Sequence, residues 1–230
     1  MRCAIVQPSY IPWRGYFDLI RRVDVFVFYD DVQYDTNGWR NRNRIKTASG
    51  VQWLTIPVHA RGAQSNHRPI QSIQMVDDGW PRRHGQTLVR AYSKAPHFRE
   101  HRDWLEAVFA APPPLLADFT IPLTVDIAAR LGITSTRFLR SSALGASGAK
   151  TDRLLDVLRG VGASCYLSGP TARPYLDEGR LSDAGIAVEW MAYDYPPYPQ
   201  LYPPFDPHVS ALDLLFMTGP RAIDFIAVRD

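Results

Sequence analysis

The sequence predicts an α/β fold with a mostly parallel sheet and helices on both faces, and three observations predict it. Short β-rich runs alternate with segments of helical spacing along nearly the whole chain. Between Arg2 and Tyr29 the chain already contains a strand, a loop, a helix and a second strand, and the strands of such a unit are parallel. Hydrophobic residues make up 46% of the 230 residues, which is ample for a core. We therefore expect a single domain over residues 1–230.

The first unit also indicates where a site should lie. Residues 3–6 are a short apolar run that predicts a buried strand, and this strand ends at Gln7. Residues 16–22 have helical spacing, and residues 25–29 form a second β-rich run that stops at Asp30. Ligands of parallel sheets bind at the carboxyl ends of the strands, so we expect the site at the edge that these two strand ends mark.

The middle of the chain is predicted to contain a polar segment and one or two strands, followed by a helical block. Residues 35–44 form a polar segment, residues 51–58 alternate like a strand, and residues 70–76 could form another short strand. Residues 80–92 and 98–111 have helical patterns, and three prolines end the second one. We expect this helical block, at about residues 79–114, to be an insertion or subdomain within the domain.

The second half continues the alternation of strands and helices. We expect helices over residues 115–131 (kinked at Pro122), 151–159, 173–177, 209–217 and 220–228, strands over residues 136–139, 163–167 and 186–190, and a small-residue loop over residues 141–150. Residues 193–207 are rich in Pro and Tyr, which excludes regular structure. This segment is long enough to be a lid or a covering loop.

Composition and cysteine usage narrow the class of protein. A net charge of +3, from 26 basic and 23 acidic residues, is too small for a nucleic-acid footprint and fits anionic small molecules. Cys3 and Cys165 lie in apolar, strand-like runs without CxxC spacing, as buried thiols in a reducing compartment do. The chain shows no signal peptide and no apolar run long enough to span a bilayer, so we expect a cytoplasmic protein without a membrane or nucleic-acid partner.

Two adjacent carboxylates are the strongest catalytic candidates. Asp30 and Asp31 follow the second strand, and in extended backbone only one of them can point into a given pocket. A carboxylate in a partly desolvated cleft can serve as a general base or hold a substrate ammonium group, with Gln33 as a nearby substrate contact. The alternative is that both are helix-capping or solvated turn residues.

A polar and aromatic cluster follows these carboxylates. Arg42 could hold a carboxylate or phosphate, Asn41 and Asn43 could supply oriented amide contacts, and Trp39 is expected to belong to the same substrate-binding cluster. The alternative is an Asx-turn loop with the indole packed over it. His84 is a possible second acid or base if its helix faces the cleft, although a histidine with satisfied hydrogen bonds on a helix is more common.

Two later loops could contact a phosphate. Residues 145–151 resemble a shortened phosphate loop without the G-K-[ST] ending, and Lys150 and Thr151 could bind a phosphate or a phosphopantetheine arm there. The alternative is a flexible loop with Thr151 as a helix cap. Ser168 and Gly169, at another strand end, could supply backbone contacts.

A metal site is not expected. Residues 97–101 match the H-x-x-E-H pattern of inverted zinc proteases, and the spacing places both imidazoles on one helical face. No third ligand accompanies them, and Arg99 and Arg102 add repulsive charge. We expect no metal and no resident cofactor.

Several motifs together resemble a known family. They are Ile5-Val6-Gln7-Pro8, Gly15-Tyr16-Phe17, Tyr29 to Tyr34, Gly38 to Asn43, Trp80 with His84, Tyr92 with Ala95-Pro96, Tyr166 to Gly169, and Phe205 with residues 210–214. This pattern resembles the WbqC-like family of bacterial proteins and covers nearly the whole chain. The resemblance implies a role in the biosynthesis of O-antigen sugars or secondary metabolites, namely joining an acyl or aminoacyl unit to an amine.

The first turn is also similar to that of a second group. Residues 13–16 stand where nucleotidylyltransferases and pantothenate-synthetase-like enzymes carry a His-x-Gly-His motif, which implies a Rossmann-like sheet of the HUP type. Trp13 and Tyr16 replace both histidines, and each can donate one hydrogen bond but carries no positive charge. We expect Gln7 and Tyr16 to contact substrate, and adenylyl transfer at this turn is disfavoured.

These observations predict a biosynthetic acyl or aminoacyl transferase. A carrier thioester is already activated, so attack by an amine requires orientation and the removal of one proton. The expected partners are a small-molecule amine and an acyl or peptidyl carrier protein with a phosphopantetheine-linked donor. One alternative is an ATP-dependent or other nucleotide-dependent ligase on the same fold, and another is a non-catalytic carrier-docking module.

Overall fold

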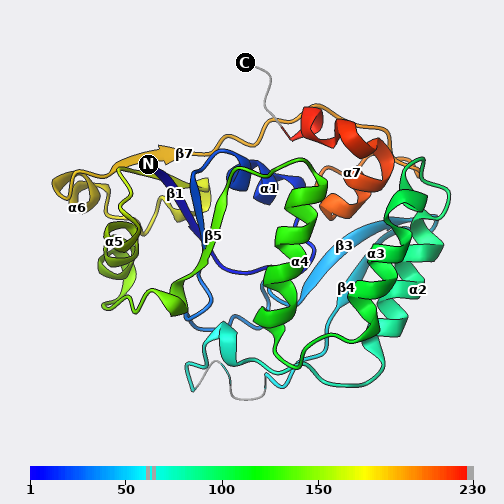
Figure 1. The fold of residues 1–230 in the computed structure, drawn as a ribbon, viewed down its shortest axis with the longest axis horizontal. Coiled ribbons are helices and arrows are strands. Elements are labelled where there is room, and N and C mark those ends of the chain that lie inside the picture. The colour runs from blue at the N-terminus through cyan, green and yellow to red at the C-terminus, as the bar shows by residue number, and fades with distance from the viewer. Residues whose placement is uncertain (61–62, 64–65, 227–230) are drawn as a thin grey trace.

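A five-stranded parallel sheet forms the centre of the molecule, which is known here as a computed structural model that describes residues 1–60, 63 and 66–226 (Figure 1). Its strand order is β5-β2-β1-β6-β7, and every neighbouring pair is parallel. The strands are β1 (Arg2–Val6), β2 (Val25–Phe28), β5 (Arg137–Arg140), β6 (Cys165–Ser168) and β7 (Ala187–Trp190). The predicted α/β class with a mostly parallel sheet is confirmed.

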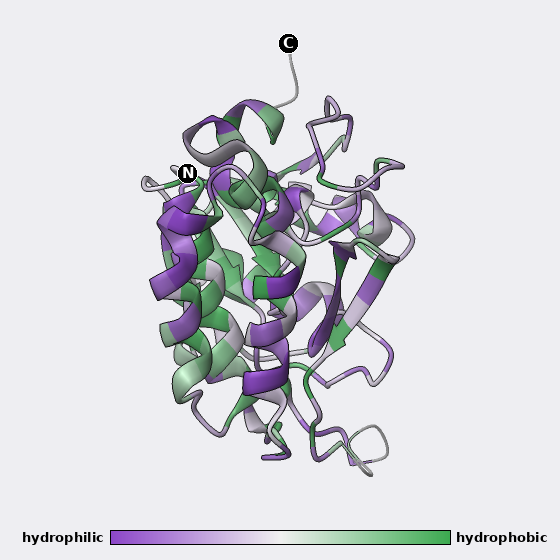
Figure 2. Cartoon of the chain, turned by 90° about the vertical axis from the view of Figure 1, so that its right-hand side faces the viewer, coloured by the Kyte–Doolittle hydropathy of each residue, from purple (hydrophilic) through white to green (hydrophobic). Residues whose placement is uncertain are grey.

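Seven α-helices lie in the described part of the chain. They are α1 (Arg14–Arg21), α2 (Trp80–Tyr92), α3 (Phe98–Ala110), α4 (Leu116–Arg130), α5 (Lys150–Val161), α6 (Glu178–Asp183) and α7 (Ala211–Thr218). Successive side chains of a central strand point to opposite faces of the sheet, so each central strand contributes to two hydrophobic cores. Phe26 and Phe28 pack with residues of α1, α4 and α7, whereas Val25 and Val27 pack with residues of α5 and α6. The helices are hydrophilic on their outer sides and hydrophobic where they face the interior (Figure 2).

A separate antiparallel hairpin lies beside the sheet. It consists of β3 (Arg42–Thr47) and β4 (Gly50–Thr55), and Arg44 is paired with Trp53. The polar segment predicted over residues 35–44 therefore contains the start of a strand. The charged and amide side chains of β3 obscured it, because strand patterns are recognised by β-branched and aromatic residues.

Three other predicted elements were wrong. Within residues 70–76, only Ile70–Ser72 form a regular element, a 3₁₀ turn, because Ile70 and Ile73 are both buried and their spacing suits a helical turn. Gln74 and Met75 make isolated β-bridges and no strand. The short helix expected at residues 173–177 is replaced by a 3₁₀ turn, Pro170–Ala172, and by α6, which Asp177 caps by accepting from the Arg180 amide. The last predicted helix is a 3₁₀ segment, Gly219–Phe225, and residues 227–230 lie outside the described part.

The helical block at about residues 79–114 corresponds to α2 and α3. The two helices pack on each other, α2 also contacts β3, and α3 contacts α7. Its status as an insertion stays a prediction. No helix among the described residues combines the length and the apolar character needed to cross a bilayer.

A buried polar network joins the hairpin, α2, α7 and the Pro- and Tyr-rich segment. Asp213 of α7 is fully buried and accepts hydrogen bonds from Gln200, at 3.1 Å, and from the hydroxyls of Tyr92 and Tyr198. Lys46 of β3 is also buried, and its ammonium group donates to the Pro204 carbonyl. Burial raises the pKa of Asp213 to about 6, although these hydrogen bonds oppose the rise.

We expect Asp213→Asn to make the protein more stable relative to wild type as the pH rises. Between the ordinary carboxyl pKa of about 3.8 and about 6, Asp213 is protonated in the folded state but ionised in the unfolded state. The stability that wild type gains from this protonation is therefore fully present below about 3.8 and is lost as the pH rises to about 6. At about 1.4 kcal/mol per pKa unit the whole shift corresponds to about 3 kcal/mol, and about 2 kcal/mol of it should appear between pH 4.5 and 7. Urea unfolding of both proteins at pH 4.5 and 7 measures it, and a difference that does not change with pH would contradict the assignment.

Candidate functional site

A cavity of about 840 Å³ lies at the carboxyl edge of the sheet. Gln7 follows β1, Tyr29 follows β2, and Ser168 and Gly169 end β6, and all four line it. The chain leaves β1 toward β2 on one side of the sheet and later adds β6 on the other side. The crevice between β1 and β6 is thus the topological switch point, which is where open parallel sheets bind ligands.

The cavity wall is aromatic and positively charged. Seven Trp and Tyr side chains line it, namely Trp13, Tyr16, Tyr29, Trp39, Tyr166, Tyr175 and Tyr193. Arg40 and Arg44 supply positive charge, and none of the described lining residues is Asp or Glu. Burial lowers the pKa of Arg40, but an arginine stays protonated at neutral pH. A cavity of this size and lining suits an anionic ligand with an apolar or planar part.

Asn43 shapes the loop that joins β1 to α1 and lines part of the cavity. Its amide nitrogen donates to the carbonyls of Tyr10 and Ile11, each at 3.0 Å, and its oxygen accepts from the Arg44 amide at 2.8 Å. Ile11 has a φ of 37°, which is rare for a β-branched residue. Strained backbone persists where surrounding contacts fix it, and here the hairpin provides those contacts.

The glycine of the first turn accommodates a side chain of the protein itself. A Cβ atom at Gly15 would lie 2.3 Å from the indole of Trp13, so the ring lies directly against the start of α1. The same ring contacts Tyr193, with centroids 5.1 Å apart, and His208, at 5.7 Å. The indole of Trp13 therefore fills the space beside Gly15.

His208 and Asp206 form a pair at the cavity that the sequence did not indicate. His208 lines the cavity, its side chain is 63% exposed, and its Nδ1 lies 3.9 Å from an Asp206 carboxylate oxygen. Arg44 fixes both residues, because it lies 3.8 Å from the Asp206 carboxylate and donates to the His208 carbonyl at 3.3 Å. The only local signal was a carboxylate two positions before a histidine, directly after the Pro-rich segment.

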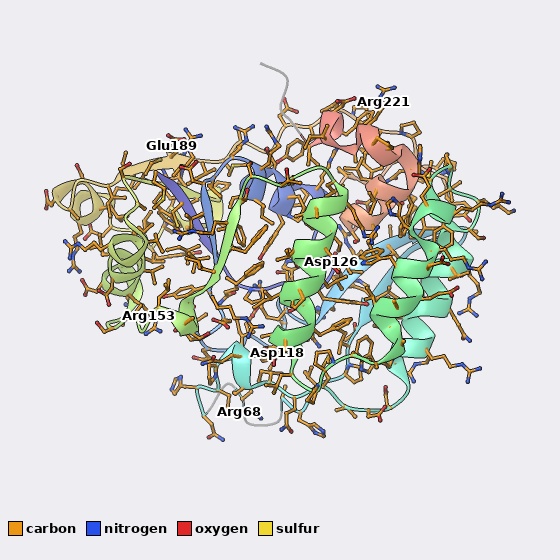
Figure 3. All side chains as sticks on the ribbon, viewed as in Figure 1. Arg68, Asp118, Asp126, Arg153, Glu189 and Arg221 are labelled. Carbon is orange, nitrogen blue, oxygen red and sulfur yellow. The ribbon has the colours of Figure 1, made fainter. Side chains whose placement is uncertain are left out.

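Asp30 and Asp31 are held by other parts of the protein. Asp30 is fully buried and accepts hydrogen bonds from the hydroxyls of Ser141 and Ser142 and from the Ser142 amide. Asp31 accepts from Ser141 at 2.6 Å and pairs with Arg153, which projects from α5 (Figure 3). Neither carboxylate lines the cavity. These contacts tie β2 to the segment after β5, and the catalytic role of the pair stays a prediction.

His84 lies in the core with both ring nitrogens engaged. Its Nδ1 accepts from the Tyr10 hydroxyl at 2.9 Å, and the ring also hydrogen-bonds the Thr55 backbone. The ring packs against Trp80 at a centroid distance of 5.2 Å. Burial, helped by the charge of Arg83, lowers the pKa of His84 to about 4, so the imidazole is neutral at pH 7. It does not line the cavity.

The remaining predicted contacts also divide between the cavity and other places. Asn41 is buried and donates to the Ile56 carbonyl at 2.7 Å, and Arg42 donates to the Asn37 carbonyl at 2.6 Å. Thr151 accepts from the Asp177 amide at 3.3 Å. Of the predicted residues, those that line the cavity are Gln7, Tyr16, Trp39, Asn43, Ser168 and Gly169, and those that do not are Asp30, Asp31, Gln33, Asn41, Arg42, His84, Lys150 and Thr151.

The fold and the cavity define an α/β protein with a ligand-sized cavity at the switch point of a parallel sheet. The chain belongs to the WbqC-like protein family, whose match covers residues 7–225. It is 43% identical over 227 residues to a Mycobacterium tuberculosis protein with the name "Uncharacterized protein Rv1507c". This match covers 98% of this chain and 97% of the Mycobacterium tuberculosis protein. No solved structure matches the chain, and the HUP-type assignment stays a prediction.

We expect Gly15→Ala to destabilise the protein by about 1–3 kcal/mol, because the new methyl group must displace the Trp13 ring. Gly160→Ala in α5 is a matched control, since a Cβ there meets no atom within 4 Å. The control should stabilise the protein by about 0.5–1 kcal/mol through helix propensity. Urea unfolding measures both changes. Equal stabilisation by the two substitutions would show that the Trp13 ring does not constrain Gly15.

Proposed function

We propose that this WbqC-like protein is a biosynthetic enzyme that transfers an acyl or aminoacyl group from a thioester to an amine. The observation that carries the proposal is the lining of the cavity. It has aromatic walls, two arginines and, among its described lining residues, a single histidine, His208. Such a site suits a substrate that is already activated. A thioester needs only to be oriented and to meet an amine that has lost a proton.

The reaction requires no group beyond those of the substrates and one base. The amine nitrogen attacks the thioester carbonyl, the carbon–sulfur bond breaks, and the electron pair leaves with sulfur. The proton from the amine passes to His208 and then to the thiolate, so the products are an amide and a thiol and the imidazole is restored.

The Asp206 carboxylate gives the imidazole its orientation. Asp206 lies on the Nδ1 side of His208, which leaves the other ring nitrogen for the substrate. Arg44, which contacts Asp206, also lines the cavity and is placed to attract a phosphate or carboxylate of the donor.

We expect His208→Gln to lower the rate of amide formation by about a hundredfold or more, because it removes the base. His59→Gln is the matched control, since this exposed histidine does not line the cavity. Both variants and wild type are offered an aminoacyl thioester of pantetheine and a panel of amines, and mass spectrometry follows the amide. A variant at position 208 that reacts as fast as wild type would exclude His208 as the base. Absence of product from wild type with every thioester would exclude the transferase.

ATP-dependent ligation is the second candidate function. The position of the cavity at the topological switch point favours it, because nucleotides bind there in related architectures. A free acid, the amine and ATP form the matching reaction mixture, and amide formation that depends on ATP and releases AMP or ADP would favour the ligase over the thioester-dependent enzyme.

A further inference from the structure

The basic residues of the chain are unevenly distributed. Between Thr36 and Val76 there are six Lys and Arg residues and no Asp or Glu. The rest of the chain, with 20 basic and 23 acidic residues, has a net charge of −3. The hairpin of β3 and β4 lies within this basic stretch and carries Arg42 and Arg44 in addition to the buried Lys46.

One surface of this hairpin combines arginines with exposed tryptophans. We call the group of Trp39, Arg42, Arg44 and Trp53 the hairpin face. Trp39 and Trp53 are stacked, with centroids 5.4 Å apart and planes at 28°, yet they remain 43% and 46% exposed. The guanidinium carbons of Arg42 and Arg44 lie 4.9 Å and 5.9 Å from the Trp53 ring centre. Large exposed indoles beside arginines are typical of the central residues of protein interfaces.

The hairpin face is continuous with the cavity. Trp39 and Arg44 belong to both, so a molecule bound on the face lies next to the cavity entrance. Arg44 shares its charge with Asp206, but Arg42 has no carboxylate within 4 Å in the described part of the chain. Arg42 is therefore available to pair with an acidic group of a partner.

We infer that the hairpin face docks an acidic carrier protein, which delivers the donor thioester into the cavity on its phosphopantetheine arm. This inference rests on the proposed function and names the partner of that site. Acidic side chains of the carrier pair with Arg42, and an apolar patch covers the two indoles. The arm passes Trp39 and Arg44, which belong to both the face and the cavity, and carries the thioester into the cavity.

Two variants test the docking directly, Arg42→Glu and Trp53→Ser. Arg221→Glu is the matched charge reversal, because this exposed arginine lies on the 3₁₀ segment after α7 and outside the hairpin (Figure 3). Each protein is given the same alanyl group on two donors, a phosphopantetheinylated acidic acyl carrier protein and free pantetheine. We expect both hairpin variants to raise KM for the carrier-bound donor by about tenfold or more and to leave KM for the pantetheine thioester unchanged. Far-UV circular dichroism confirms that each variant is folded.

The outcomes separate this inference from the proposed function. If wild type uses the pantetheine thioester but neither binds nor uses the carrier-bound donor, or if the hairpin variants use both donors as wild type does, the docking inference fails and the transferase stands. If wild type uses neither donor, the transferase fails, and calorimetric binding of the carrier to wild type and Arg42→Glu decides the docking alone. Binding that weakens as salt is raised supports the charge pairing.

Discussion

The hydrogen bonds of Asn43 to the loop between β1 and α1 are the constraint on which the site depends. This one carboxamide satisfies two carbonyls of the loop and one amide of its own strand. It holds Ile11 in a left-handed conformation that the isolated loop would avoid. The position of Trp13, and with it the shape of the cavity, follows from the course of this loop. A small hairpin outside the sheet therefore determines the geometry at the carboxyl edge of the sheet.

The same hairpin makes three sets of contacts that link the fold to the proposed site. Its buried side holds the loop through Asn43, and Lys46 joins the polar network around Asp213. Arg44 fixes Asp206 and the backbone of His208. Its outer surface presents the hairpin face. Because one antiparallel pair of strands carries all these contacts, a partner bound on the hairpin lies close to the groups that we propose to act on the substrate.

The catalytic proposal depends on which polar groups are free and which are engaged. Asp30, Asp31 and His84 have the residue types of acids and bases, but each is surrounded by hydrogen-bond partners that stabilise the fold. His208 instead lies at the cavity with an exposed ring and a neighbouring carboxylate. A group that must exchange protons with a substrate has to remain accessible, and this requirement favours the exposed imidazole over the buried carboxylates.

The sequence by itself determined the α/β class, the first β-α-β unit and the edge of the sheet where the cavity lies, because periodicity and strand ends are local properties. It also indicated Gln7 and Ser168 as residues of that edge. Only the tertiary structure decided which polar side chains reach the cavity. Asp30 meets Ser141 across 111 positions of sequence, and His208 reaches Trp13 from the far end of the chain. Burial and pairing depend on such distant contacts, so no local pattern could show that the carboxylates were engaged or that the histidine was free.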